Sequence, residues 1–455
     1  MERVDVAIVG GGPAGSSAAG AAARRGADAV VFEKGVPRAD REGLGPDSTD
    51  AAGMLDYWID LMDYRPEEIP DDVILSRLDG AEFVGPTERV TLSDTGIEAS
   101  YDGFGFAFHR ARFDDWLRAE AEAAGATYRV GTAVRDVETD LSGGHSHRLT
   151  LADGDEIEAE YLVLADGPQR TVTMGVLDQF VPDGRSMRDH LASTTANHIA
   201  YQEHRRFPAD VFDPELIKFW WGLIPGHTAY PWVFPNDDRV VRVGLTMPIG
   251  VDLDRVRNRD AYDLLSDEDE QVPPGRVYLR RLLEREYGDR YDVPEDFPLV
   301  EDRGKQGGTE AYPISSTRPI ESPTAAGVAV AGGAMGTTSA FHEGGDHVAV
   351  RTGKLAGELA AEGRLSRYND AWRDAIGEEI RRNVAMADLV RGYEPADWDR
   401  TFRTADRLLD RGGTGLVEAL TTGVDAVKLV GAYKRRKFAL RNGGYVQFRE
   451  DEYAV

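Results

Sequence analysis

A glycine-rich turn near the N-terminus is compatible with very few folds. An apolar segment at residues 4–9 runs into Gly-Gly-Gly-Pro-Ala-Gly, and a helical stretch then leads to a second apolar segment ending at Glu33. Gly10, Gly12 and Gly15 form the pattern GxGxxG within this strand, turn, helix and strand, which is typical of dinucleotide-binding domains. Gly10 would make the tight turn, Gly12 would admit a pyrophosphate and Gly15 would allow close helix packing. Glu33 would accept a hydrogen bond from a ribose hydroxyl.

Three later segments extend this pattern along the chain. They are HRARFDDWLRAEAEAAGA (109–126), YLVLADGPQR (161–170) and a strand, glycine loop and helix at 328–360. In this order, the four motifs resemble those of the glutathione-reductase-type flavoproteins, in the branch that includes p-hydroxybenzoate hydroxylase. The resemblance implies an α/β fold, with a Rossmann-like FAD domain, an inserted antiparallel β-sheet substrate domain and a helical C-terminal region.

The resemblance also implies FAD as the cofactor and identifies the residues that would hold it. These are Gly10, Gly12, Pro13, Ala14, Gly15, Glu33, Lys34, Arg110, Val134, Asp166, Gly167, Gly332, Gly333, Gly336, Gly344 and Gly345. In the family, an aspartate on the flavin ribityl chain occupies the position of Gly333, so this contact is altered here. Gly344 and Gly345 begin a helix whose N-terminal amides would face the flavin N1/C2 carbonyl edge, where reduced flavin carries negative charge.

The order of the motifs predicts a discontinuous flavin domain. We expect residues 1–50, 105–182 and 310–365 to form the FAD-binding domain, residues 51–104 and 183–309 to form a substrate-binding sheet over the flavin, and residues 366–455 to be helical. No second nucleotide fingerprint is visible, because the glycine cluster at 411–415 follows no strand. Electrons are therefore expected from a transient donor such as ferredoxin, a deazaflavin or NAD(P)H.

The charge of the chain excludes one class of partner. The formal net charge is -27, from 80 acidic and 53 basic residues, and only seven of the basic residues are lysine. This composition resembles adaptation to multimolar salt, in which screening over about 3 Å removes most of the self-repulsion. A halophilic, archaeal-type protein is the expectation. Nucleic acid is an unfavourable partner, because binding phosphates needs a basic surface.

The absence of cysteine, of an export signal and of long apolar runs limits the kinds of site and the location that we expect. The chain contains no cysteine, which excludes disulfides, thiolate metal sites and a cysteine nucleophile, and we assign no metal site. The first residues begin a strand without an export signal, and no run of about 18 apolar residues occurs. We therefore expect a cytoplasmic protein.

A second unusual segment places three aromatic residues at every second position. Tyr230, Trp232 and Phe234 would project from one face of a strand, and Asn-Asp-Asp at 236–238 predicts a turn into a return strand. Such a face is often plain sheet core. Because the two prolines of this strand cannot donate to a ladder, the strand is expected at a sheet edge or at a bulge.

The same segment carries a more specific resemblance. YxWxFP followed after eight residues by glycine resembles the signature of the geranylgeranyl reductase family, which shares the flavin motifs. Its members have Gly-x-Gly where this chain has Gly244-Leu245-Thr246, and some carry a cysteine in the loop equivalent to 41–50 that is absent here. The resemblance implies an FAD-dependent reductase that saturates isoprenoid double bonds of archaeal-type lipids or a prenylated quinone. The implied substrate contacts are Tyr230, Trp232, Phe234, Pro235, Gly244 and Trp221.

The reduction of an isolated alkene restricts the catalytic requirements. An apolar polyprenyl chain is held by shape and buried area, at about 25 cal/mol per Å². Because no enolate can absorb the hydride, a proton must add early, and positive charge then builds on the tertiary carbon. The motifs allow three proton donors, Tyr230, His342 and Glu343, and do not distinguish among them.

Two other functions remain open at this stage. A flavin-dependent monooxygenase or halogenase could use the same scaffold, since halide-using relatives carry a similar Trp-x-Trp-x-Ile-Pro segment. Alternatively, the altered position 333 would suit a redox-inactive polyprenyl-lipid-binding protein. The basic segment AYKRRKFALRNG (432–443) adds peripheral contact with the inner face of the cell membrane as a minor hypothesis, against simple pairing with the acidic body of the protein.

Overall fold

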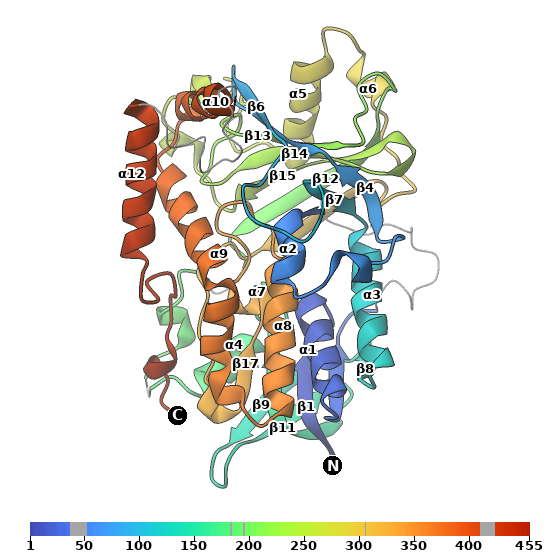
Figure 1. Cartoon of the computed structure of the whole chain (residues 1–455), viewed down its shortest axis with the longest axis vertical. Helices are drawn as coiled ribbons and strands as arrows, with labels where there is room; N and C mark the ends of the chain where they lie inside the picture. The colour runs from blue at the N-terminus through green and yellow to red at the C-terminus, as the bar shows by residue number, and fades with distance from the viewer. Residues whose placement is uncertain (37–51, 183, 194–195, 305, 410–423) are drawn as a thin grey trace.

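The computed structural model describes residues 1–36, 52–182, 184–193, 196–304, 306–409 and 424–455. Its helices and three β-sheets are arranged along one long axis, and both chain termini lie at the same end (Figure 1). The cysteine-free loop at 41–50 and the glycine cluster at 411–415 lie outside the described residues.

The first sheet forms the core of the end that carries the termini. Its strand order is β8-β2-β1-β11-β10-β9, and β17 also pairs with β11. The strands are β1 (Glu2–Val9), β2 (Ala29–Glu33), β8 (Thr127–Val130), β9 (Val134–Asp140), β10 (Ser146–Leu151), β11 (Glu156–Leu164) and β17 (Val328–Val330). β8, β2, β1, β11 and β17 pair in parallel, whereas β9, β10 and β11 are antiparallel. The C-terminal half of β1 is continuously apolar because both of its faces are covered.

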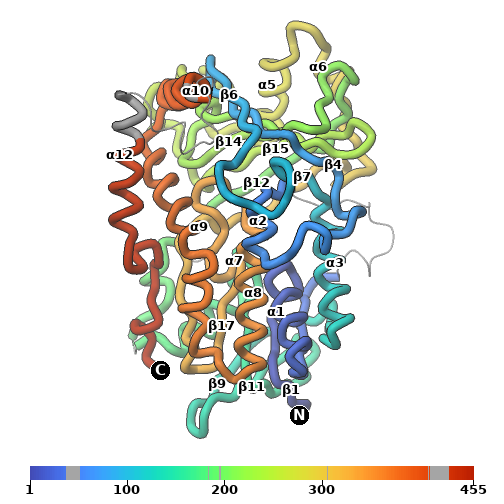
Figure 2. Tube along the Cα trace, in the orientation of Figure 1, coloured from blue at the N-terminus to red at the C-terminus, as the bar shows by residue number. Residues whose placement is uncertain are grey.

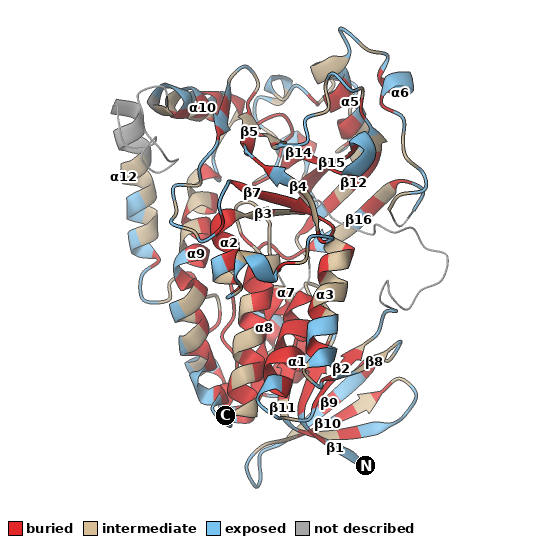
Figure 3. Ribbon diagram, turned by 45° about the vertical axis from the view of Figure 1, so that its right-hand side comes forward, coloured by how far each residue is buried: buried red, intermediate tan, exposed pale blue. Residues whose placement is uncertain are grey.

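Three helices pack closely beside this sheet, and two of them, α1 (Pro13–Arg24) and α8 (Asp346–Ala361), are rich in small residues. α1 packs against both α8 and α3 (Arg110–Ala123), and it lies between them in the lower half of Figure 1. Side chains at Gly353 and Gly357 of α8 would overlap the backbone of α1. The two glycines therefore let the helix backbones touch, and this contact positions the N-terminus of α8 beside the N-terminus of α1. In Figure 3, α1, α7 (Gly332–Met335) and α8 are coloured mainly as buried.

The second sheet lies at the opposite end of the molecule. Its order is β16-β12-β15-β14-β13-β5-β6. The strands are β5 (Gly80–Val84), β6 (Arg89–Leu92), β12 (His198–Arg206), β13 (Leu216–Trp220), β14 (Tyr230–Pro235), β15 (Val240–Pro248) and β16 (Thr309–Ile314). α5 (Gly275–Tyr287) buries an apolar stripe against β12 and β15, and α6 (Val293–Asp296) follows it. A three-stranded sheet of β3 (Gly53–Leu55), β7 (Gly105–Phe108) and β4 (Ile74–Leu78) completes the set.

Two details of the predicted second sheet were wrong. β14 lies between β15 and β13 and not at a sheet edge. The prolines are tolerated there because β14 pairs with β13 only at Trp232 and Val233. Those two positions lie between Pro231 and Pro235, so neither proline has to donate to β13. The sheet is also not entirely antiparallel, since β5 pairs in parallel with β13. β5 comes from the first insert, and no hairpin connects it to β13. The predicted turn after Asn236 was confirmed.

Helices dominate the C-terminal region, as predicted. α9 (Tyr368–Val390) packs against α8 and α12 (Val424–Ala439), and α10 (Pro395–Leu409) packs against β6 (Figure 2). The shorter helices are α2 (Asp56–Leu61) and α4 (Thr173–Asp178). In the described ranges, no helix is both long enough and apolar enough to cross a bilayer.

Candidate active site

A cavity of about 560 Å³ connects the glycine turn with the second sheet. Gly12 and Gly345 line it from the first domain, and Tyr230, Trp232 and Phe234 line it from β14. The fold therefore brings the nucleotide motifs and the aromatic strand, which are far apart in the sequence, into one space.

At one end of the cavity, the turn after β1 is shaped for a phosphate group. Gly10 has φ +100, a conformation that side chains rarely adopt, and a Cβ at Gly15 would overlap the Gly10 carbonyl. A Cβ at Gly12 would meet nothing within 4 Å. Gly12 is also the N-cap of α1, and the first turn of this helix has neither a side-chain cap nor an acidic residue. Its N-terminal amides and its dipole therefore favour an anion such as a pyrophosphate.

The N-terminus of α8 faces the same cavity. Gly344 and Gly345 precede the helix, and Asp346 begins it and pairs with Arg110 at 2.9 Å between Oδ1 and Nη1. Gly333 of α7 also lines the cavity without contributing a side chain. The cavity wall still contains a carboxylate, because Asp346 lies in the first turn of α8. The N-terminus of this helix suits the negative edge of a reduced flavin.

Half of the predicted FAD contacts line the cavity. These are Gly12, Pro13, Ala14, Arg110, Gly167, Gly333, Gly344 and Gly345. Gly10, Gly15, Gly332 and Gly336 shape the turns, and Gly332 and Gly336 have φ +59 and +86. A Cβ at Gly12 or Gly167 would meet nothing within 4 Å, so the cavity has open space at both glycines. These residues and this space fit FAD.

The remaining predicted contacts have other surroundings. Glu33 accepts hydrogen bonds from the backbone N–H groups of Gly11 at 2.7 Å and Gly35 at 2.6 Å. Lys34 is exposed, and the Val134 side chain is buried in the core of the first sheet. Glu33 is thus in place beside the glycine turn, with its carboxylate held by the turn itself.

The Asp166 side chain holds the backbone that follows it and does not line the cavity. Its Oδ2 accepts hydrogen bonds from the backbone N–H groups of Val172 at 2.7 Å and Thr173 at 3.1 Å, and its Oδ1 accepts one from the Thr173 hydroxyl. The carboxylate thus ties the end of β11 to the start of α4. The neighbouring Ala165, Gly167 and Pro168 line the cavity instead.

We expect Asp166→Ala to weaken the fold more than the cofactor site. Loss of these hydrogen bonds should lower the free energy of unfolding by about 1–2 kcal/mol. Denaturant unfolding and FAD titration of the same variant measure the two effects. Weakened FAD binding with unchanged stability would instead make Asp166 a direct cofactor ligand.

Aromatic rings enclose the other end of the cavity. Phe219 and Trp221 line it, while Trp220 between them is buried in the core beneath α5. Trp221 stacks on Tyr230 with 4.4 Å between ring centroids and on Phe341 at 5.2 Å. We call this part of the cavity the aromatic chamber; its ring-bearing wall residues are Phe83, Phe104, Phe219, Trp221, Tyr230, Trp232, Phe234, Tyr312 and Phe341.

The spacing in the YxWxFP motif is explained by strand register. Trp232 pairs with Gly244 across β14 and β15, and a Cβ at Gly244 would overlap the indole ring. The glycine thus leaves room for the ring to lie across its neighbour. Phe234 has a similar partner, because a Cβ at Gly53 would lie 2.6 Å from its ring. Pro235 is buried but does not line the cavity, and Gly244 shapes it only through Trp232.

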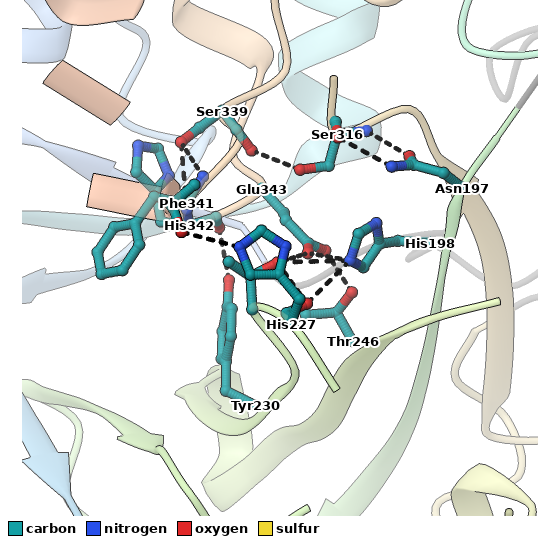
Figure 4. A network of polar contacts seen from close by, with 12 residues as sticks. Asn197, His198, His227, Tyr230, Thr246, Ser316, Ser339, Phe341, His342 and Glu343 are labelled. Atoms are coloured by element: carbon teal, nitrogen blue, oxygen red, sulfur yellow. Dashed lines mark hydrogen bonds and ion pairs between the residues drawn. The ribbon is translucent and has the colours of Figure 1, made fainter. Parts of the chain in front are cut away.

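The three proton-donor candidates meet at the boundary between the two parts of the cavity. Tyr230, His342 and Glu343 all line it. The Tyr230 hydroxyl donates to the His342 carbonyl, and Glu343 contacts the Thr246 hydroxyl and the His198 ring (Figure 4). Burial raises the pKa of Glu343 from 4.5 to about 8, although hydrogen bonds from Thr246 and Thr228 act in the opposite direction.

Sequence reasoning missed a buried polar cluster on the flank of the cavity. Glu379 of α9 lies 3.9 Å from Nε2 of both His342 and His347 and forms an ion pair with Arg382. Burial opposes its ionisation, yet these three partners hold its pKa well below the usual range. Trp58 stacks on His347 with 4.1 Å between centroids. No sequence motif predicts this cluster, because its members come from an insert, from α8 and the loop before it, and from α9.

Comparison with known proteins gives two kinds of match. Residues 49–205 match the tryptophan halogenase family model. Over 89% of this chain and 92% of the relative, the chain is 26% identical to digeranylgeranylglycerophospholipid reductase 2 of Methanothermobacter thermautotrophicus. A shorter match, 27% identical, to digeranylgeranylglycerophospholipid reductase 1 of Methanosphaera stadtmanae covers 60% of each chain.

In sequence, the chain is similar to digeranylgeranylglycerophospholipid reductases over most of its length. Its relatives include a menaquinone reductase of Mycolicibacterium smegmatis, 27% identical over 85% of this chain and 83% of that protein. Solved structures agree on the fold. A geranylgeranyl bacteriochlorophyll reductase-like protein of Thermoplasma acidophilum has a TM-score of 0.68 at 20% identity, covering 97% of this chain and 99% of that one. A myxobacterial FAD-dependent chondrochloren halogenase has 0.58 at 18%, covering 96% and 97%.

These similarities agree with the fit of the cavity to FAD. The predicted α/β fold with a Rossmann-like flavin domain was confirmed, and the protein is an FAD-dependent oxidoreductase.

Proposed function

We propose that this protein is an FAD-dependent reductase that saturates isoprenoid C=C bonds of a geranylgeranyl lipid or a prenylated quinone. The observation that carries the proposal is the single cavity that joins the glycine turn at Gly12 to the aromatic chamber around Trp232. The names of the relatives, digeranylgeranylglycerophospholipid reductase and menaquinone reductase, support the same two substrate classes.

The aromatic chamber suits a ligand that has no hydrogen-bonding groups. A polyprenyl chain gains about 25 cal/mol for each Å² of apolar surface that leaves water. Burial of Tyr230, Trp232 and Phe234, which are 4%, 4% and 7% exposed, keeps water from the reacting carbons. Ring faces also stabilise a developing carbocation by about 0.5–2 kcal/mol each.

FAD, when bound and reduced, would supply a hydride for the alkene. Gly12 and the N-terminus of α1 would hold the pyrophosphate, and Gly344 and Gly345 would bring the N-terminal amides of α8 to the flavin. The remaining requirements fall on the chain: to orient the prenyl chain between the rings, to exclude water and to provide a proton.

Three further features belong to the same proposal. The electron donor would be a transient partner, such as ferredoxin, a deazaflavin or NAD(P)H. The acidic, lysine-poor composition supports a halophilic, archaeal-type setting in the cytoplasm. Exposed Lys434, Arg435 and Phe438 on α12 would suit peripheral contact with an anionic membrane surface.

An anaerobic assay tests the proposed function. We expect chemically reduced protein, incubated without air with unsaturated diether lipid or with menaquinone, to add one H₂ per saturated bond, as detected by mass spectrometry. Oxidised protein is the matched control and should leave the substrate unchanged. Absence of hydrogen addition to both substrates by flavin-loaded, reduced protein would contradict the proposal.

Halogenation is the second candidate, because residues 49–205 match the tryptophan halogenase model. A halogenase or monooxygenase needs oxygen, so its product would appear only in air, carrying a halogen or an oxygen atom. A third possibility, a polyprenyl-lipid carrier without FAD, would give a colourless protein that does not take up FAD.

A further inference from the structure

One acidic side chain stands between the flavin end of the cavity and the aromatic chamber. Glu343 lies in the loop before α8 and has φ +58, a left-handed conformation that is unusual for a residue other than glycine. Its side chain is 2% exposed, and it lines the cavity beside Tyr230 and Thr246. The strained backbone turns a carboxyl group into a niche between the loop and the second sheet.

The niche can satisfy this carboxyl in either protonation state. The Thr246 hydroxyl contacts Oε2, and Oε1 lies 3.3 Å from the Thr228 hydroxyl and 3.4 Å from Nε2 of His198 (Figure 4). A hydroxyl can donate to a carboxylate or accept from a carboxylic acid. The carboxyl can therefore release a proton without leaving an unsatisfied buried group.

No stable positive charge faces Glu343 in the described surroundings. The nearest cationic candidate is His198, whose pKa burial lowers to about 4. His227, whose backbone carbonyl contacts Nε2 of His198, also has a pKa lowered by burial. The group therefore resembles a buried acid that burial keeps protonated near neutral pH, with a pKa of about 8.

The two other candidates are committed to different contacts. The Tyr230 hydroxyl donates to the His342 carbonyl, and burial followed by the charge of Glu343 raises its pKa well above 10. His342 Nδ1 accepts from the Gly344 N–H at 3.2 Å, and Nε2 lies 3.4 Å from the Asn383 amide. Both side chains are thus engaged with the loop before α8 or with α9.

We propose that Glu343 is the proton donor to the isoprenoid double bond, an inference that rests on the proposed reductase function. The Glu343 O–H bond breaks, and the π-electron pair of the alkene forms a C–H bond with the released proton. Reduced FAD, when bound, would supply a hydride to the adjacent carbon, so that the net addition would be H₂. The resulting carboxylate is held by the hydroxyls of Thr246 and Thr228.

Glu343→Gln tests this role while preserving the shape of the side chain. In anaerobic single turnovers of the flavin-loaded protein, we expect alkene saturation to slow by about 100-fold or more, with flavin reduction by dithionite unchanged. The wild-type rate should fall as pH rises through about 8, and the residual rate of the variant should not. Glu156→Gln, at an exposed position of β11, is the matched control and should behave as wild type.

Two measurements do not depend on turnover. Infrared spectra of the wild type and of Glu156→Gln should contain a protonated carboxyl band at pH 7 that titrates near pH 8 and is absent from Glu343→Gln. Between about pH 4.5 and 8, folded Glu343 holds a proton that the unfolded chain releases, so wild-type stability falls with rising pH. The melting temperature of wild type should therefore decline relative to Glu343→Gln across this range.

The outcomes separate this inference from the proposed function. An active wild type with an equally active Glu343→Gln, or an infrared spectrum showing ionised Glu343 at pH 7, would overturn the inference alone. A flavin-loaded wild type that saturates no isoprenoid would overturn the proposed function and this inference with it.

Discussion

Replacing Gly12 with alanine should strongly weaken cofactor binding and leave the fold intact. A Cβ at this position meets nothing within 4 Å, so the cofactor-free protein should keep its melting temperature. The added methyl would occupy the space in which a pyrophosphate approaches the N-terminus of α1. We expect FAD affinity to fall by about 100-fold or more, because loss of charge-assisted hydrogen bonds costs about 3 kcal/mol.

Fluorescence titration with FAD and thermal unfolding of the cofactor-free protein check this expectation. Gly175→Ala is the matched control, because a Cβ at Gly175 of α4 also meets nothing within 4 Å and does not face the cavity. It should bind FAD normally. Normal FAD affinity in Gly12→Ala would show that the pyrophosphate does not lie at this turn.

Replacing Gly244 with alanine should disable the aromatic chamber without releasing FAD. The new Cβ would overlap the Trp232 indole, which must then move from its place on β15. Overpacking of this kind costs about 1–3 kcal/mol of stability. Because even a small misplacement of a bound reactant is costly, we expect alkene saturation to slow by about 10–100-fold.

A second substitution makes this prediction specific to the ring. Trp232→Phe in the Gly244→Ala background removes the overlapping atoms and should restore part of the lost stability, as measured in a double-mutant cycle. Gly392→Ala, where a Cβ meets nothing within 4 Å, is the control and should retain activity. Additive effects of the two substitutions would contradict the proposed contact between Gly244 and Trp232.

Local patterns predicted the elements of the flavin domain well. GxGxxG between two apolar segments requires a tight turn and a helix N-terminus without a side-chain cap, and β1, Gly10 and α1 have these features. The alternation of Tyr230, Trp232 and Phe234 likewise predicted three rings on one face. Such features depend on residues close together in the chain, so the sequence contains their physical cause.

Pairing between distant segments could not be predicted in the same way. The prolines of β14 suggested an edge strand, but β13 pairs with it only between them. The outcome depended on where the neighbouring strand paired with β14, which no local pattern specifies.

The sequence by itself determined that the chain carries a nucleotide turn and an aromatic strand, because turn chemistry and side-chain alternation are local properties of the backbone. Only the tertiary structure decided that these two features share a cavity and that Glu343 stands between them. A pKa near 8 at Glu343 arises from burial by β12, β14 and β15, which lie about one hundred residues or more before it in the chain.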